Sequence, residues 1–253
     1  MSTGLGPLDL SSFVRHYPFL EFLAVSPLLW LALTLGAYIV ATSLYERANK
    51  MPLVNPTLLA ITAVVLVLWA TGTSYKRYFD GAQFIHFLLG PAVVGLAVPL
   101  YRHTALIRQS AAAICAALAV GSLTAILSVV LVAHRLGATR ELVLSIAPKS
   151  ATVAISMGIS ERIGGVAPLT AIMTVFTGIA GACLATFVFR LTGVTAWHAR
   201  GFAMGLSSHG IATARAFQEH ETAGTFAALA MALNGVATAL LVPLIVGLLR
   251  RFW

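Results

Sequence analysis

Long apolar runs separated by short polar or charged stretches cover most of this chain. The runs span residues 27–44, 53–70, 84–100, 110–133, 142–159 and 166–189, then a seventh segment that ends near Arg215, and finally 226–249. Runs of this kind approach the roughly 20 residues that a helix needs to cross a bilayer. The pattern therefore predicts an all-α fold, a polytopic transmembrane helix bundle of about seven or eight spans.

The run 142–159 contains a proline and a lysine near its middle. Lys149 is its only charge, and a lysine at the bilayer centre costs roughly 2.5–3.5 kcal/mol unless it lies near a helix end and reaches the interface. Pro148 lacks an N–H and disfavours helix at the preceding residue, so the helix is expected to break here. Irregular backbone at membrane depth occurs only where protein or a water-filled cavity surrounds it. We therefore expect a solute site at a discontinuous helix, and seven spans if the segment is a re-entrant hairpin.

A second helix break is predicted at Gly90 and Pro91, in the third run. Gly90 and His209 are 119 positions apart (209 − 90), and matching breaks in two halves are typical of transporters built from repeats. One interpretation is a single membrane domain with a two-fold internal repeat, about 21–140 and 141–250. The alternative is chance similarity, because apolar stretches of small residues resemble one another easily.

The seventh segment has the densest set of hydrogen-bond donors. Thr213 follows His209 by four residues and would share its helical face. Cations, hydroxyls and helix N-terminal amides together suit a small anion. The predicted substrate-binding residues are Lys149, Ser150, Thr152, Ser208, His209, Gly210, Thr213 and Arg215, beside helix breaks at Gly90, Pro91 and Pro148. The alternatives left open are that the hydroxyls bond to helix carbonyls, that His209 donates a fixed hydrogen bond, and that Arg215 lies at the membrane interface.

Composition excludes several other classes. Of 253 residues, 59% are hydrophobic and 9% are charged, whereas about a quarter of residues are charged in soluble domains. The net charge of +8 comes from basic residues that flank apolar runs, which indicates a lipid bilayer as partner and not nucleic acid. Cys115 and Cys183 have no metal-ligand spacing, so we predict packing roles for them, with no metal and no cofactor.

The adjacent serines and histidine do not form a catalytic motif. A nucleophile elbow needs glycine two residues after the serine, and the chain has His209 two residues after Ser207. No acid is placed to orient the histidine, so we predict that the protein is not an enzyme. Gly201 and Gly205 are expected to form a close-packing face, and Asn234 to hydrogen-bond between helices.

Several short motifs resemble those of the LrgB/CidB family of membrane proteins, and the match covers nearly the whole chain beyond the first run. They are Leu89-Gly90-Pro91-Ala92, Ala147-Pro148-Lys149-Ser150, Gly158-Ile159-Ser160, Ile163-Gly164-Gly165, Ser208-His209-Gly210-Ile211, Thr213-Ala214-Arg215-Ala216, Leu229-Ala230-Met231 and Asn234-Gly235. Family members also carry threonine and proline where this chain has Val153 and Ala154, which leaves the choice of substrate open.

The resemblance implies a transporter of small monocarboxylates such as glycolate, glycerate or pyruvate, since a plastid relative resembles a glycolate/glycerate translocator. It also implies an alternative, an antiholin-like or holin-like regulator of murein hydrolase export and autolysis. The expected setting is the cell membrane, as a homo-oligomer and, in the alternative, with a small LrgA-like membrane partner. For a transporter, His209 is the candidate for proton coupling because histidine ordinarily titrates near neutral pH.

Overall fold

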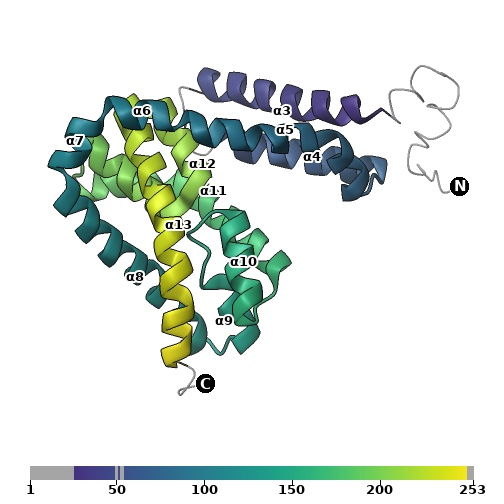
Figure 1. Cartoon of the computed structure of the whole chain (residues 1–253). Coiled ribbons are helices and arrows are strands. Elements are labelled where there is room, and N and C mark those ends of the chain that lie inside the picture. The colour runs from purple at the N-terminus through teal and green to yellow at the C-terminus, as the bar shows by residue number, and fades with distance from the viewer. Residues whose placement is uncertain (1–25, 49–50, 52–53, 250–253) are drawn as a thin grey trace, which may run out of the picture. The chain divides into compact units, whose positions relative to one another are not determined.

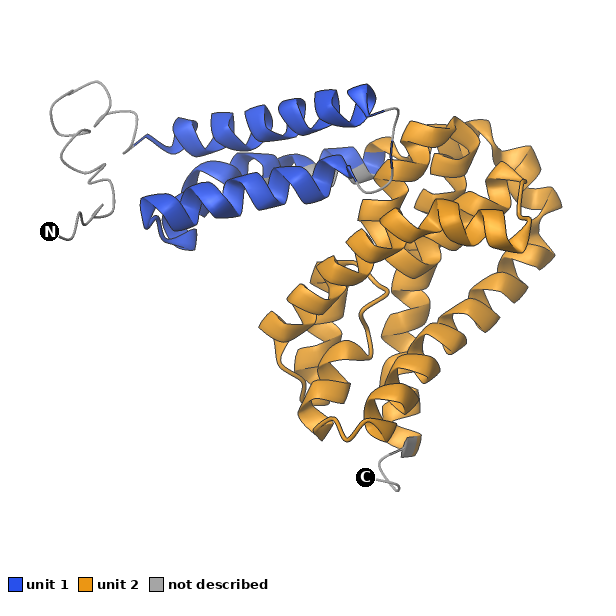
Figure 2. Cartoon of the chain, turned by 180° about the vertical axis from the view of Figure 1, so that it is seen from behind, with its two compact units in different colours: residues 1–94 blue, residues 95–253 orange. Residues whose placement is uncertain are grey.

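The computed structural model describes residues 26–48, 51 and 54–249 (Figure 1). Within these ranges all regular structure is helical, from α3 to α13. The chain divides into two compact units, residues 1–94 and 95–253, which are coloured separately in Figure 2. The all-α prediction is confirmed for the described residues, and each unit is considered by itself below.

The first unit contains α3 (Pro27–Arg47), α4 (Pro56–Thr71) and α5 (Tyr75–Gly95). Ser26 caps α3 and Asn55 caps α4, each directly before a proline in the first turn, where the missing N–H of the proline removes no helical bond. The break expected at Gly90 and Pro91 is absent, because α5 continues through both residues. A proline removes one hydrogen bond, and a membrane helix can continue past it when its other bonds persist.

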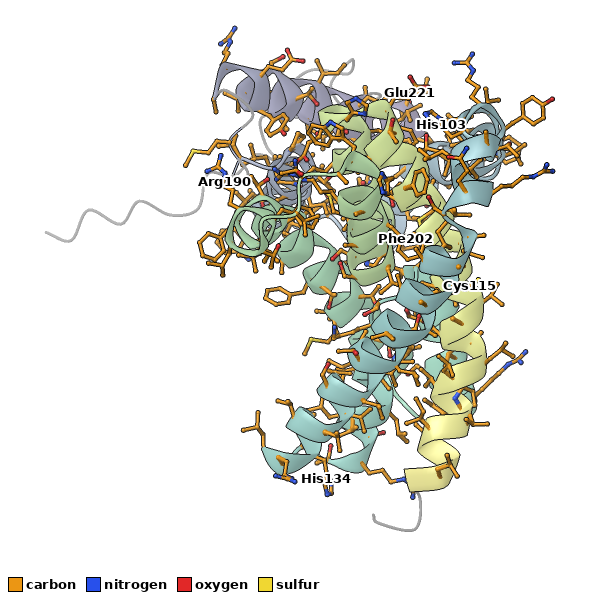
Figure 3. The ribbon with its side chains drawn as sticks, turned by 90° about the vertical axis from the view of Figure 1, so that its left-hand side faces the viewer. His103, Cys115, His134, Arg190, Phe202 and Glu221 are labelled. Carbon is orange, nitrogen blue, oxygen red and sulfur yellow. The ribbon has the colours of Figure 1, made fainter. Side chains whose placement is uncertain are left out.

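The second unit begins with two short helices and contains three long ones. The short helices are α6 (Ala97–Arg102) and α7 (Thr104–Gln109), and the long ones are α8 (Ala111–Arg135), α11 (Ala167–Thr192) and α13 (Glu221–Leu249). The three long helices and α3 have the length and apolar composition of membrane spans. His134 and Glu221 lie at opposite ends of this unit, with the apolar helices between them (Figure 3). The protein is therefore a polytopic helical membrane protein.

The segment around Lys149 is a hairpin and does not cross from one end of the unit to the other. Its arms are α9 (Arg140–Ile146) and α10 (Val153–Ile163), joined by a non-helical tip at 147–152. The Ser156 hydroxyl donates to the Pro148 carbonyl at 2.7 Å, which ties the second arm to the tip. We call this element the Lys149 hairpin.

The predicted seventh span also folds back. Residues 197–219 form α12 (Trp197–Glu219), but Ser208 and His209 have non-helical dihedral angles. The guanidinium of Arg200 lies 3.5 Å from the carboxylate of Glu219. These residues would lie about 28 Å apart along one straight helix, at 1.5 Å per residue. We call this element the His209 hairpin, with a first arm before its tip at Ser208 and His209 and a second arm after it.

The two hairpins enter from opposite ends of α11. The Ser145 hydroxyl, in the first arm of the Lys149 hairpin, accepts from the N–H of Val166 at the start of α11. At the other end of α11, the ring of Phe189 lies 5.0 Å from the guanidinium of Arg200, near the base of the His209 hairpin. The tips therefore point toward each other in the interior of the unit.

This arrangement is an inverted repeat of a long helix followed by a hairpin. A shift of 58 positions (208 − 150) superimposes Ser150 on Ser208. The same shift carries α8 onto α11 and the arms of the Lys149 hairpin onto those of the His209 hairpin. This repeat lies within the second unit and is shorter than the one expected for 21–140 and 141–250.

Glycines allow the His209 hairpin to pack closely against α13. A Cβ on Gly201 would overlap the backbone of Ala223, and one on Gly205 would overlap that of Ala227. Gly201 and Gly205 therefore form a close-packing face, as predicted, but its partner is a helix of the same chain. This face offers no support for a contact with a second subunit.

Candidate functional site

The tips of the two hairpins meet in a cavity of about 520 Å³. Its polar lining comes from both tips, from the turn of helix before the second one and from Thr177 of α11. The lining residues are Ala125, Lys149, Ser150, Phe176, Thr177, Ala180, Gly181, Leu184, Ala185, Val188, Phe189, Ala203, Met204, Ser207 and Ser208. Ser150 is joined through Asn234 to α13, and Asn234 is the fourteenth of the 29 residues in that helix. The cavity is thus level with the middle of a membrane span.

Lys149 is the charged group of this cavity, and it is half-buried. None of the ion pairs between described residues involves Lys149, and its amine has no hydrogen-bond partner among them. An ammonium group removed from water is costly unless it is paired. A bound anion would supply the missing partner.

Hydroxyl groups complete the polar side of the cavity. Ser150 and Ser208 are buried, whereas Ser207 is exposed to the cavity. The hydroxyls of Ser207 and Ser208 lie 3.1 Å apart, and Ser207 also donates to the Ala203 carbonyl at 2.8 Å. Gly181 of α11 makes room for this pair, because a Cβ there would overlap the Ser208 hydroxyl.

His209 does not line the cavity. Its Nε2 lies 3.0 Å from the carbonyl oxygen of Thr174, which can only accept, so Nε2 donates a fixed hydrogen bond. The backbone of His209 has φ 41° and ψ −135°, a conformation that costs a non-glycine residue about 1–3 kcal/mol. Thr213 donates to the His209 carbonyl at 2.7 Å, and Gly210 lies beside Met231. These three residues shape the tip without lining the cavity.

Arg215 belongs to a separate charged cluster near the base of the His209 hairpin. Its Nε donates to Glu219 at 3.0 Å and its Nη2 donates to Thr186 at 2.9 Å. Glu219 also pairs with Arg200, whose guanidinium lies 4.6 Å from the ring centre of Trp197. Arg215 was expected to neutralise the anion together with Lys149, but its guanidinium is paired with the carboxylate of Glu219.

Thr152 is the N-cap residue of α10 and does not line the cavity, and its side chain makes no capping bond. Ser207 of the His209 hairpin and Thr177 and Gly181 of α11 also line the cavity, although none of them is among the predicted binding residues. Ser207 directly precedes the predicted Ser208 and His209 in the donor-rich seventh segment, while Thr177 and Gly181 have no sequence signal beyond lying on one face of an apolar helix.

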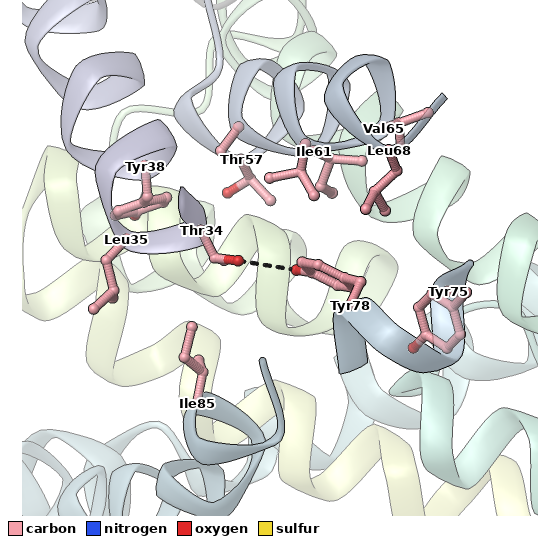
Figure 4. A pocket seen from close by; sticks show the side chains of 12 residues that line it. Thr34, Leu35, Tyr38, Thr57, Ile61, Val65, Leu68, Tyr75, Tyr78 and Ile85 are labelled. Carbon is pink, nitrogen blue, oxygen red and sulfur yellow. Dashed lines mark hydrogen bonds between the residues drawn. The ribbon is translucent and has the colours of Figure 1, made fainter. Parts of the chain in front are cut away.

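The first unit contains a cavity of about 530 Å³ with different chemistry. It lies between α3, α4 and α5 and is lined mainly by apolar side chains (Figure 4). The hydroxyls of Thr34 and Tyr78 in its wall lie 3.1 Å apart and bond to each other. No charged side chain lines it, so it offers an anion no counter-charge.

Comparison with known proteins places the chain in a family. Residues 34–248 match the LrgB-like family. The chain is 30% identical to the holin-like protein CidB of Staphylococcus epidermidis over 218 residues, 86% of this chain and 95% of that relative. It is 29% identical over 222 residues to the holin-like protein CidB of Staphylococcus aureus strain Mu50, covering 88% of this chain and 96% of the relative.

A third relative is the uncharacterized protein YwbG of Bacillus subtilis, 34% identical over 215 residues, which cover 84% of this chain and 94% of that protein. No solved structure matches the chain. The family match covers both units and includes both hairpin tips. The chain therefore belongs to the LrgB-like family of multi-pass bacterial membrane proteins.

Proposed function

We propose that the protein moves small carboxylate anions across the membrane by way of the cavity between the two hairpin tips. The observation that carries this proposal is Lys149, which has no ion-pair partner in the described part of the chain and lies where two inverted, broken-helix hairpins meet. Broken helices related by an inverted repeat form the substrate sites of many secondary transporters, at the bilayer midplane. The family resemblance supports the same class of substrate.

The chemistry of the cavity suits a 2-hydroxy or 2-oxo monocarboxylate. The Lys149 ammonium neutralises the carboxylate, and charge-assisted hydrogen bonds of this kind are the stronger ones. Ser150 can donate to the oxygen at the second carbon, whereas Ser207, whose proton goes to the Ala203 carbonyl, can accept from a 2-hydroxyl group. The apolar wall from α11 surrounds the short carbon chain.

Uptake into proteoliposomes tests the proposal. The purified protein is expected to give saturable uptake of glycolate, glycerate or pyruvate, because a binding site of fixed volume fills at high substrate concentration. Vesicles without protein provide the background, and a longer fatty acid of the same charge provides the size control. Absence of uptake for all three acids would exclude this function.

A second candidate is a holin-like role, in which the chain conducts or regulates the release of murein hydrolases. The two CidB relatives are named as holin-like proteins, and this name supports the holin-like role more directly than it supports transport. A homo-oligomer or an LrgA-like partner would be required, since one cavity of about 520 Å³ is too small for a folded protein. Release of a large trapped dye from the same proteoliposomes would favour this role, whereas acid uptake without dye release would favour the carrier.

Proton coupling is predicted to depend on His209, if the carrier imports protons with the anion. Moving one negative charge inward against 100 mV costs about 2.3 kcal/mol, which a co-transported proton offsets. An acidic exterior is then expected to increase uptake by the parent protein but not by His209→Gln, which keeps a donor for Thr174 and does not titrate. Equal responses to the pH gradient in both proteins would assign His209 only its fixed hydrogen bond and would favour exchange of one acid for another.

A further inference from the structure

Asn234 of α13 lies between the two hairpin tips and is 1% exposed. Its amide nitrogen donates to the carbonyl of Ser150 at 3.0 Å and to that of Leu206 at 2.9 Å. Ser150 belongs to the tip of the Lys149 hairpin, and Leu206 precedes the tip of the His209 hairpin. One side chain therefore bonds to both tips.

Both carbonyls are available because the helices break beside them. A regular helix satisfies each carbonyl with the N–H four residues later, and the breaks at 147–152 and at Ser208 and His209 interrupt that pattern. A buried carbonyl without a partner is costly, so most are bonded in native proteins. The two N–H groups of Asn234 meet this need at both breaks at once.

The orientation of the Asn234 amide is itself fixed. Ser122 of α8 donates to its Oδ1 at 2.7 Å, and Thr238 of α13 lies 3.4 Å from the same oxygen. An asparagine amide has two donors and one acceptor oxygen with two lone pairs. With the oxygen held by hydroxyl donors, the nitrogen is directed at the two tip carbonyls.

We propose that Asn234 is a positioning residue that couples the two tips, so that they move together with α13 as one body. The anion site then keeps its geometry while access changes from one side to the other. This inference rests on the proposed function for its role in transport, but the coupling of the tips is a property that can be measured without transport. Coupled tips would distinguish this protein from a carrier in which each hairpin opens independently.

Thiol labelling of the tips tests the coupling. Lys149→Cys and Ser207→Cys are each made in a background with Cys115→Ser and Cys183→Ser, and labelling by a membrane-impermeant maleimide is followed over time. Asn234→Leu, which has a similar volume but no donors, is added to each. We expect it to change the labelling rate at both positions by about fivefold or more, the factor that corresponds to loss of one buried hydrogen bond.

Two further variants keep the test decisive. Thr238→Val removes only the 3.4 Å contact and is the matched control, expected to leave both rates within about twofold because so long a contact contributes little. Ser122→Ala frees the amide to rotate and is expected to shift both rates in the direction of Asn234→Leu, by a smaller factor. If Asn234→Leu does not fold, Ser122→Ala decides the question.

A change at one position alone, or at neither, would overturn the coupling. If the labelling rates at both positions change but the parent protein takes up none of the three acids, the coupling is supported and the proposed function is excluded. Acid uptake by the parent, together with labelling rates that neither the Asn234 nor the Ser122 variant changes, would support the proposed function and exclude the coupling. Within a transporting protein, Asn234→Leu is also expected to raise KM, whereas a purely structural loss would lower the amount of folded protein at unchanged KM.

Discussion

Lys149→Met is expected to abolish anion uptake while raising the thermal stability of the protein. Loss of one member of a buried charge pair costs about 2–5 kcal/mol, which corresponds to a roughly 30-fold or larger loss of uptake efficiency. The free protein loses nothing in return, because Lys149 has no partner among the described residues. Methionine has a similar length and removes the cost of holding an unpaired ammonium in a half-buried position.

The two effects are measured by uptake of labelled acid into proteoliposomes and by thermal unfolding in detergent. Lys149→Arg is the matched control, since it keeps the charge and is expected to retain part of the uptake. If Lys149 instead had a structural role, the methionine variant would unfold at a lower temperature than the parent. Uptake by Lys149→Met at the parent rate would show that Lys149 does not bind the anion.

Gly205→Ala is expected to prevent the His209 hairpin from packing against α13. The added Cβ would overlap the backbone carbonyl of Ala227, which cannot rotate away as a flexible side chain could. Overpacking of a tight interior typically costs about 1–3 kcal/mol, and a backbone contact places this variant at the upper end. The expected result is a lower unfolding temperature and a smaller yield of monodisperse protein.

Gly158→Ala is the control for this variant. Gly158 lies within α10, and a Cβ there would meet nothing within 4 Å. Alanine favours helix over glycine by about 0.5–1 kcal/mol, so this variant is expected to be at least as stable as the parent. Equal unfolding temperatures for the Gly205 and Gly158 variants would show that the hairpin does not pack against α13 as closely as described.

Local chemistry made the break at Pro148 predictable. Proline lacks an N–H wherever it lies, and Lys149 beside it is costly in any apolar segment, so both signals can be read without knowing the fold. Gly90 and Pro91 had the same local signal, and α5 nevertheless continues through them. A proline weakens a helix at one bond, and whether the chain turns there depends on what surrounds it.

Arg215 forms one ion pair that its sequence neighbourhood predicts and belongs to a cluster that only the fold creates. Glu219 follows it by four residues, the spacing at which oppositely charged side chains meet on a helix, so their ion pair was visible in the sequence. The spacing along the chain did not predict the second ion pair of this carboxylate, which is with Arg200. Arg200 reaches Glu219 only because the chain reverses at Ser208 and His209.

The sequence by itself determined the membrane class, the family motifs, the break at Pro148 and the presence of one uncompensated cation within an apolar run. Only the tertiary structure decided that the segment around His209 folds back, because its strained backbone is stabilised by a hydrogen bond to Thr174 on another helix. The same holds for the site. Lys149 and Ser208 line one cavity, and Asn234 joins their two tips, because segments far apart in the sequence pack around α13.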